Sequence, residues 1–174
     1  MKKLFFLLAA TLMSVSMIAQ RHELGLVAGG LNGISHKYWF SESLAVQTDL
    51  AVGLTMAPGA IYYNGTKIAS GSNPQYDFTI NPNVAYHFEL VDDLSLYAGG
   101  GLNFGLFSDI NNTNPNAIMG KFGVNSMVGV AYALEPIVLA FDFRPGYGLG
   151  FKDGNSAHFS FFDWKLAIAV RYCF

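Results

Sequence analysis

Charged residues, cysteine and long apolar runs are all scarce in this sequence. Asp, Glu, Lys and Arg together make up only 13% of the 174 residues, and Cys173 is the single cysteine. One cysteine cannot form an internal disulfide, and no Cys/His cluster has the spacing of a metal site, so we expect neither a metal nor another cofactor. Beyond the N-terminus no run of eighteen apolar residues occurs, which excludes a helical membrane span.

The first twenty residues, "MKKLFFLLAATLMSVSMIAQ", have the pattern of a secretory signal peptide. Lys2 and Lys3 are followed by an apolar run and then by small residues near Ala19. We therefore expect a signal peptide over 1–20 and one domain over 21–174. Without the signal the chain keeps 8 basic and 12 acidic residues. This net charge of −4 leaves no basic patch, so nucleic acid is not an expected partner.

The remaining chain alternates between apolar and polar residues. In the stretch "FDWKLAIAVRYCF", which ends at Phe174, large apolar residues occupy every second position and charged or small residues the positions between. Period-two alternation predicts a strand with two different faces. No helix is predicted. Eight alternating segments follow one another, and they span about 23–31, 33–40, 44–54, 76–90, 94–107, 118–134, 137–151 and 162–174.

The connections between these segments alternate in length. Three tight turns, at 41–43, 91–93 and 135–136, alternate with longer polar loops at 57–74, 108–117 and 152–158. The exception is Asn32-Gly33, a dipeptide that favours a two-residue hairpin. Short turns at one end, long loops at the other and an even strand number are typical of outer-membrane barrels. The predicted fold is all-β: an eight-stranded antiparallel up-and-down transmembrane β-barrel.

Charges fall almost entirely on one face of the predicted strands. A lysine or arginine on the lipid face at mid-membrane costs about 2–4 kcal/mol, so these charges are expected inside the barrel. Five acids and five bases in a narrow interior predict a filled, charge-paired network rather than a pore. The expected members are Glu23, Lys37, Asp49, Asp77, Glu89, Lys121, Asp142, Arg144, Lys165 and Arg171.

Three residues fit the strand pattern poorly. Pro82 and Pro145 lie inside strands, where each removes a ladder donor, so we expect a bulge or a shorter paired region there. His36 falls on the lipid face, which predicts either a position near the membrane interface or a strand that slips by one residue. Aromatic residues gather near both ends of the predicted strands, as in the two girdles of membrane barrels.

The sequence resembles the small eight-stranded outer-membrane β-barrel family, which includes the transmembrane domain of outer-membrane protein A. The resemblance spans 21–174 and rests on the eight alternating strands, the final "AVRYCF" and the "RPGYG" segment, which is similar to short barrels of Bacteroidetes-type bacteria. It implies a place in the bacterial outer membrane, among lipid and lipopolysaccharide. It also implies that Tyr172 and Phe174 form part of the signal read by the barrel-assembly machinery.

Four functions remain open at this point. The favoured one is a filled barrel with a structural or surface-interaction role, whose loops 57–74 and 108–117 contact an extracellular ligand. The second is a small passive pore for ions or small solutes. The third is a lipid A deacylase, because His158 and Ser160 resemble such an enzyme's base and nucleophile and Asp163 is a nearby carboxylate, although Phe161 stands where that family has asparagine. The fourth is a soluble barrel that binds an apolar ligand. We do not expect an enzyme.

Overall fold

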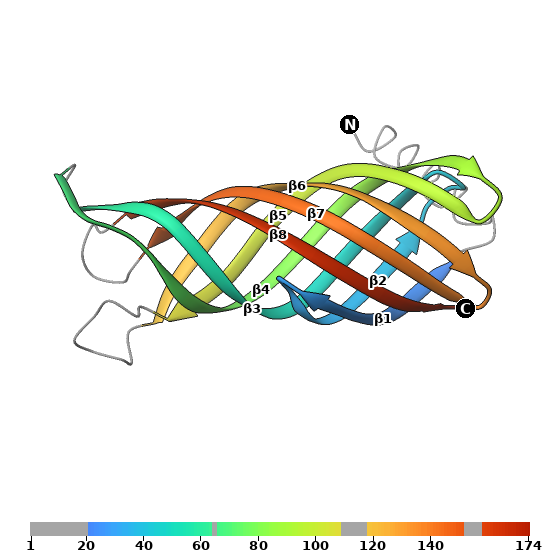
Figure 1. The fold of residues 1–174 in the computed structure, drawn as a ribbon, viewed down its shortest axis with the longest axis horizontal. Helices are drawn as coiled ribbons and strands as arrows, with labels where there is room; N and C mark the ends of the chain where they lie inside the picture. Colours follow the sequence, from blue (N-terminus) through green and yellow to red (C-terminus); the bar gives the residue numbers. More distant parts are fainter. Residues whose placement is uncertain (1–20, 64–65, 109–117, 152–157) are drawn as a thin grey trace, which may run out of the picture.

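The computed structural model is a single closed barrel of eight strands (Figure 1). It describes residues 21–63, 66–108, 118–151 and 158–174. The expected signal peptide and much of the expected loop 108–117 therefore lie outside the described residues. Each strand pairs antiparallel with the next, and β1 pairs with β8 to close the sheet, so the predicted fold class is confirmed. The strands are β1 (His22–Gly29), β2 (Asn32–Trp39), β3 (Leu44–Tyr63), β4 (Thr66–Val91), β5 (Leu94–Ser108), β6 (Ile118–Leu134), β7 (Ile137–Phe151) and β8 (His158–Cys173).

The alternation of the sequence places apolar side chains outside and polar side chains inside. Ile168 on the outer face is 57% exposed, whereas its neighbours Ala167 and Ala169 are buried in the interior. The same arrangement holds along the described part of every strand. A protein in water would bury its apolar face, so this outer surface suits lipid. Among the described residues, no helix is long and apolar enough to cross a membrane.

The first hairpin is much shorter than the others, and its turn differs from the predicted one. The turn consists of Gly30 and Leu31, while Asn32 and Gly33, the predicted turn, begin β2. The Asn32 side chain bonds to both backbone polar groups of Gly29, whose φ of 118° suits glycine. Leu31 is buried, so the tip of the hairpin packs into the barrel. The prediction was wrong because it weighed the dipeptide alone.

The expected loop 57–74 is instead mostly a continuation of two strands. β3 and β4 pair from Leu44↔Tyr86 out to Tyr63↔Thr66, with one register shift between Ile61 and Tyr62. This hairpin projects beyond the other strands at one end of the barrel (Figure 1), which we call the hairpin end. Polar, glycine-rich composition had indicated a loop, but ladder hydrogen bonds between long strands compensate for weak strand propensity. Beyond the short first hairpin, β3 also pairs directly with β8 at Ile61↔Phe159.

The other end of the barrel carries the three tight turns, and we call it the short-turn end. Exposed aromatic residues face outward at both ends, as the girdle prediction required. Those nearer the short-turn end are Phe40, Tyr86, Phe88, Tyr132, Tyr172 and Phe174, and those nearer the hairpin end are Phe78, Phe104, Phe122, Tyr147, Phe162 and Trp164, while Phe141 and Phe143 lie between the two groups.

The two prolines interrupt the ladder without shifting it. Pro82 pairs in register with Thr48 of β3, but neither Asn81 nor Pro82 has a ladder partner on β5. Pro145 pairs with Trp164 of β8 and has no ladder partner on β6. Each proline thus removes pairing on one side only, which confirms the expectation of a shorter paired region.

Several interior glycines are required by close contact between strands. A Cβ on Gly25 would lie 1.9 Å from the carbonyl oxygen of Val170 on β8. A Cβ on Gly129 would lie 2.5 Å from the ring of Tyr97, its cross-strand partner. Glycine therefore lets the backbone of β8 come close at Gly25 and makes room for the Tyr97 ring at Gly129.

Candidate functional site: the barrel interior and its open end

At the centre of the barrel one arginine lies between two aspartates. The Arg144 guanidinium donates to both Asp49 and Asp142, and all three side chains are almost fully buried. Gln47 donates from Nε2 to both oxygens of Asp49, at 3.4 and 3.2 Å. We call these four residues the middle cluster. They come from β3 and β7, strands on different parts of the barrel wall, so the side chains span its width.

A second group of ion pairs lies nearer the hairpin end, which we call the upper cluster. Lys121 and Lys165 both donate to Asp77, the second at 3.2 Å. Lys165 Nζ is also 3.0 Å from Asp163 Oδ2. Two lysines and two aspartates balance, so this level carries no net charge.

A third group, the lower cluster, lies nearer the short-turn end. Glu23 accepts from Arg171 Nε at 3.0 Å and from Trp39 Nε1 at 2.7 Å. Arg171 also donates from Nη1 to Ser35 Oγ at 3.3 Å. Each carboxylate oxygen of Glu23 thereby has a partner, which is what a buried charge requires.

Lys37 is the exception among the buried cations. It is fully buried, yet it forms no ion pair with a carboxylate of the described residues. Its ammonium lies 3.2 Å from His87 Nε2 and over the rings of Tyr97 and Trp39, at 4.7 and 5.5 Å from their centroids. Aromatic faces and an imidazole lone pair thus replace the carboxylate.

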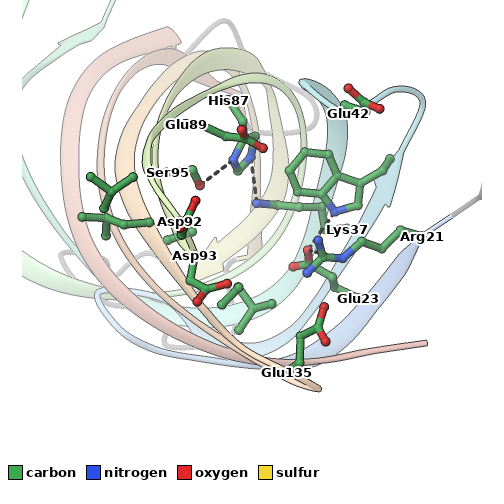
Figure 2. Close-up of a pocket in the computed structure, with 16 residues that line it drawn as sticks. Arg21, Glu23, Lys37, Glu42, His87, Glu89, Asp92, Asp93, Ser95 and Glu135 are labelled. Atoms are coloured by element: carbon green, nitrogen blue, oxygen red, sulfur yellow. Dashed lines mark hydrogen bonds and ion pairs between the residues drawn. The ribbon is translucent and has the colours of Figure 1, made fainter.

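Lys37 also marks the floor of a cavity that opens at the short-turn end. The cavity has a volume of about 420 Å³, and Figure 2 shows acidic side chains around Lys37 and His87. The lining carries six carboxylates and two cations, a net charge of −4, equal to that of residues 21–174 as a whole. This end of the barrel therefore attracts cations and repels anions. The lining acids are Glu23, Glu42, Glu89, Asp92, Asp93 and Glu135.

Hydrogen bonds link Lys37, His87 and Ser95 within this cavity. His87 Nδ1 lies 3.2 Å from Ser95 Oγ, which superficially suggests a serine and its base (Figure 2). When Lys37 is charged it can only donate, so His87 Nε2 accepts and Nδ1 carries the proton. In this state the imidazole donates to Ser95 and does not take its proton. The two hydrogen bonds, one with Lys37 and one with Ser95, hold the His87 ring in place.

The structure brings together nine of the ten residues that the sequence placed in the interior. Glu89 is the exception, because it is exposed at the mouth of the cavity near the end of β4. Asp163, which was not among the ten predicted residues, takes its place among the buried acids. It lies two residues before Lys165 on β8, so its face could have been read from the alternation. His87, Tyr97 and Gln47 were missed because neutral side chains carry no charge signal.

The deacylase candidates do not form a described triad. Asp163 is in the upper cluster, paired with Lys165. His158 and Ser160 belong to β8, and their side chains lie outside the described residues. Among the described residues, no group of three or more His, Cys, Asp or Glu could hold a metal ion.

Comparisons with known proteins identify the fold but no sequence family. No protein-family model matches the chain. No curated protein matches it either. Among solved structures, the chain is similar to the N-terminal β-barrel domain of Pseudomonas aeruginosa OprF, with 15% identity and a TM-score of 0.50 over 89% of this chain and 96% of that one.

Two further barrels match equally well. Neisserial surface protein A is 17% identical with a TM-score of 0.51, over 88% of this chain and 93% of that one. A major outer membrane protein of Thermus thermophilus is 15% identical with a TM-score of 0.50, over 90% of this chain and all of that one. The chain thus has the fold of the small outer-membrane barrels.

Proposed function

We propose that this protein is a non-conducting barrel of the bacterial outer membrane, which acts as a structural or surface-interaction protein through its hairpin end. The observation that carries the proposal is the middle cluster. Asp49 and Asp142 have no exposed surface and Arg144 is 4% exposed, which supports closure of the interior at this level. A barrel closed at its centre does not conduct, so its two ends are the surfaces with which it meets molecules outside the membrane.

The hairpin end is the better candidate for contact with an outside partner. In outer-membrane barrels short turns face the periplasm and longer connections face outward. By this rule the β3–β4 hairpin projects from the cell (Figure 1), on strands that continue the barrel wall. Residues 57–74 and 108–117 would then meet lipopolysaccharide or an extracellular ligand.

The experiment shortens the projecting hairpin without changing the register of the barrel. Replacing 57–73 with Asn-Gly leaves the paired residues Met56 and Pro74 on either side of a two-residue turn. We expect this variant to fold, shown by its shift on an unboiled gel, and cells carrying it to lose surface adhesion or detergent resistance, as cells without the gene do. A folded variant that retains every surface property contradicts the proposal.

A small pore is the second candidate, and the open cavity favours it. The cavity already extends from the short-turn end to Lys37 and His87. If the middle cluster rearranged, its charges would line a path for ions. In that case Asp142→Asn and Arg144→Gln would change ion selectivity in opposite directions, whereas in a closed barrel they change only stability.

We also propose that Tyr172 and Phe174 contact the barrel-assembly machinery. Both side chains face outward at the short-turn end and are more than half exposed. Their replacement by alanine should slow assembly into the membrane in cells while leaving the purified protein able to refold into detergent.

A further inference from the structure

Two histidines lie together on the outer, lipid-facing surface near the short-turn end. His22 on β1 and His36 on β2 are half-buried, and His22 Nδ1 is 3.3 Å from His36 Nε2. The His22 ring lies against Tyr38, with centroids 4.9 Å apart, and stacks on Phe174 at 5.7 Å. His36 keeps the predicted register, which excludes a slipped strand and leaves a position near the membrane interface as the expected one.

The pair plays no part in the interior network, and most of its neighbours on the outer face are apolar, although Thr48 of β3 is the cross-strand partner of His36. Leu24 and Leu26 are the next outward-facing residues after His22 on β1, and Ile34 is next to His36 on the outer face of β2. An imidazole on such a surface gives up hydration unless another group binds it. A single N–H···N hydrogen bond satisfies one nitrogen of each ring.

The separation of the two nitrogens also suits a shared metal ion. Zinc binds histidine nitrogen at about 2.0–2.1 Å in tetrahedral geometry, which places two such nitrogens roughly 3.3–3.4 Å apart. The observed distance is 3.3 Å, and with the ring centroids 5.6 Å apart each ring must rotate to turn its nitrogen from the other ring toward a shared ion. The ladder between β1 and β2 holds the two residues at this distance on adjacent strands, with Leu24↔His36 and His22↔Tyr38 as paired positions.

We propose that His22 and His36 form a binding site for a divalent transition-metal ion, of which Zn²⁺ and Cu²⁺ suit imidazole best. The protein supplies two ligands, and water fills the remaining positions on the open side. Because the ligands come from two strands, only the folded barrel presents both. The bound ion therefore cross-links β1 to β2 beside the aromatic girdle.

The test uses the mature, untagged protein folded in detergent, because a histidine tag would itself bind the ions. We expect calorimetric titration with ZnCl₂ to give one site per barrel, and the Cu²⁺ form to show nitrogen coupling by electron paramagnetic resonance. Loss of even an outer-shell partner costs about 10–100-fold in affinity, so His22→Gln and His36→Gln should each cost at least as much. His158→Gln is the matched control and should bind as the original protein does.

A stability measurement provides a second readout. An ion that binds only the folded state stabilises it, so saturating Zn²⁺ should raise the unfolding temperature of the original protein and of His158→Gln, but not that of the double variant His22→Gln/His36→Gln. The proposal is overturned if the original protein shows no saturable binding at millimolar Zn²⁺. It is equally overturned if the folded double variant binds with unchanged affinity.

Discussion

Replacing Arg144 with methionine should destabilise the barrel strongly, because it leaves two aspartates buried without a cation. Asp49 and Asp142 are both fully buried, and Arg144 is the cation between them. Removing one partner of a buried ion pair typically costs about 3–5 kcal/mol. Gln47 continues to donate to Asp49, which places the expected loss within this range rather than above it.

The assay is reversible unfolding by urea in lipid vesicles, followed by the fluorescence of Trp39 and Trp164. With a denaturant dependence of ~2 kcal/mol per molar urea, the midpoint should fall by about 1.5–2.5 M. Lys37→Met is the matched control, since it removes a buried cation that pairs with no described carboxylate. It should cost less than half as much.

A third variant separates the loss of a charge from the loss of packing. Asp49→Leu/Asp142→Leu/Arg144→Met replaces the whole ion triad with apolar side chains, an exchange that is often neutral or stabilising. It should recover most of the stability lost by Arg144→Met. The reasoning is refuted if Arg144→Met costs less than about 1 kcal/mol, the range of a surface ion pair.

Two further predictions concern the outer face and the closure of the sheet. Ile168→Arg on the outer face should lower the free energy of unfolding in vesicles by about 2–4 kcal/mol. At a position equally exposed to water the same change would alter this free energy by no more than roughly 0.5 kcal/mol. An effect that small would contradict a lipid-facing surface. Gly25→Ala should prevent the β1–β8 closure and abolish the shift on an unboiled gel, because its Cβ would lie 1.9 Å from the Val170 carbonyl oxygen. The control Gly146→Ala, whose Cβ would have its nearest contact at 3.3 Å, should still fold. Equal behaviour of the two variants would show that the close contact is unimportant.

The strands and the face of each residue could be predicted from the sequence, but depth along the barrel could not. Alternation alone placed Asp49, Arg144 and Lys165 inside, because side chains two apart share a face. It gave no reason to separate buried Asp163 from exposed Glu89, since that difference depends on strand tilt and stagger. The same limit applies to partners: Lys121 of β6 meets Asp77 of β4, which are not adjacent strands.

Turn positions were predictable only where burial and strand pairing elsewhere in the chain did not shift them. The tight turn at 135–136 lies where the sequence places it, between β6 and β7. The first turn falls at Gly30-Leu31 because Leu31 can then be buried, a gain that the favourable Asn-Gly dipeptide does not offset. The strand character of 57–74 arises from pairing between β3 and β4, which no local pattern reports.

Single-channel recording in planar bilayers tests the central claim, closure of the barrel by the middle cluster, most directly. The recording compares the refolded mature protein with Arg144→Met, using only material that shifts on an unboiled gel. The account predicts no conductance steps for the original protein at any moderate voltage. Stable, uniform steps from the correctly folded original protein would contradict it and would make the pore the better description of its function.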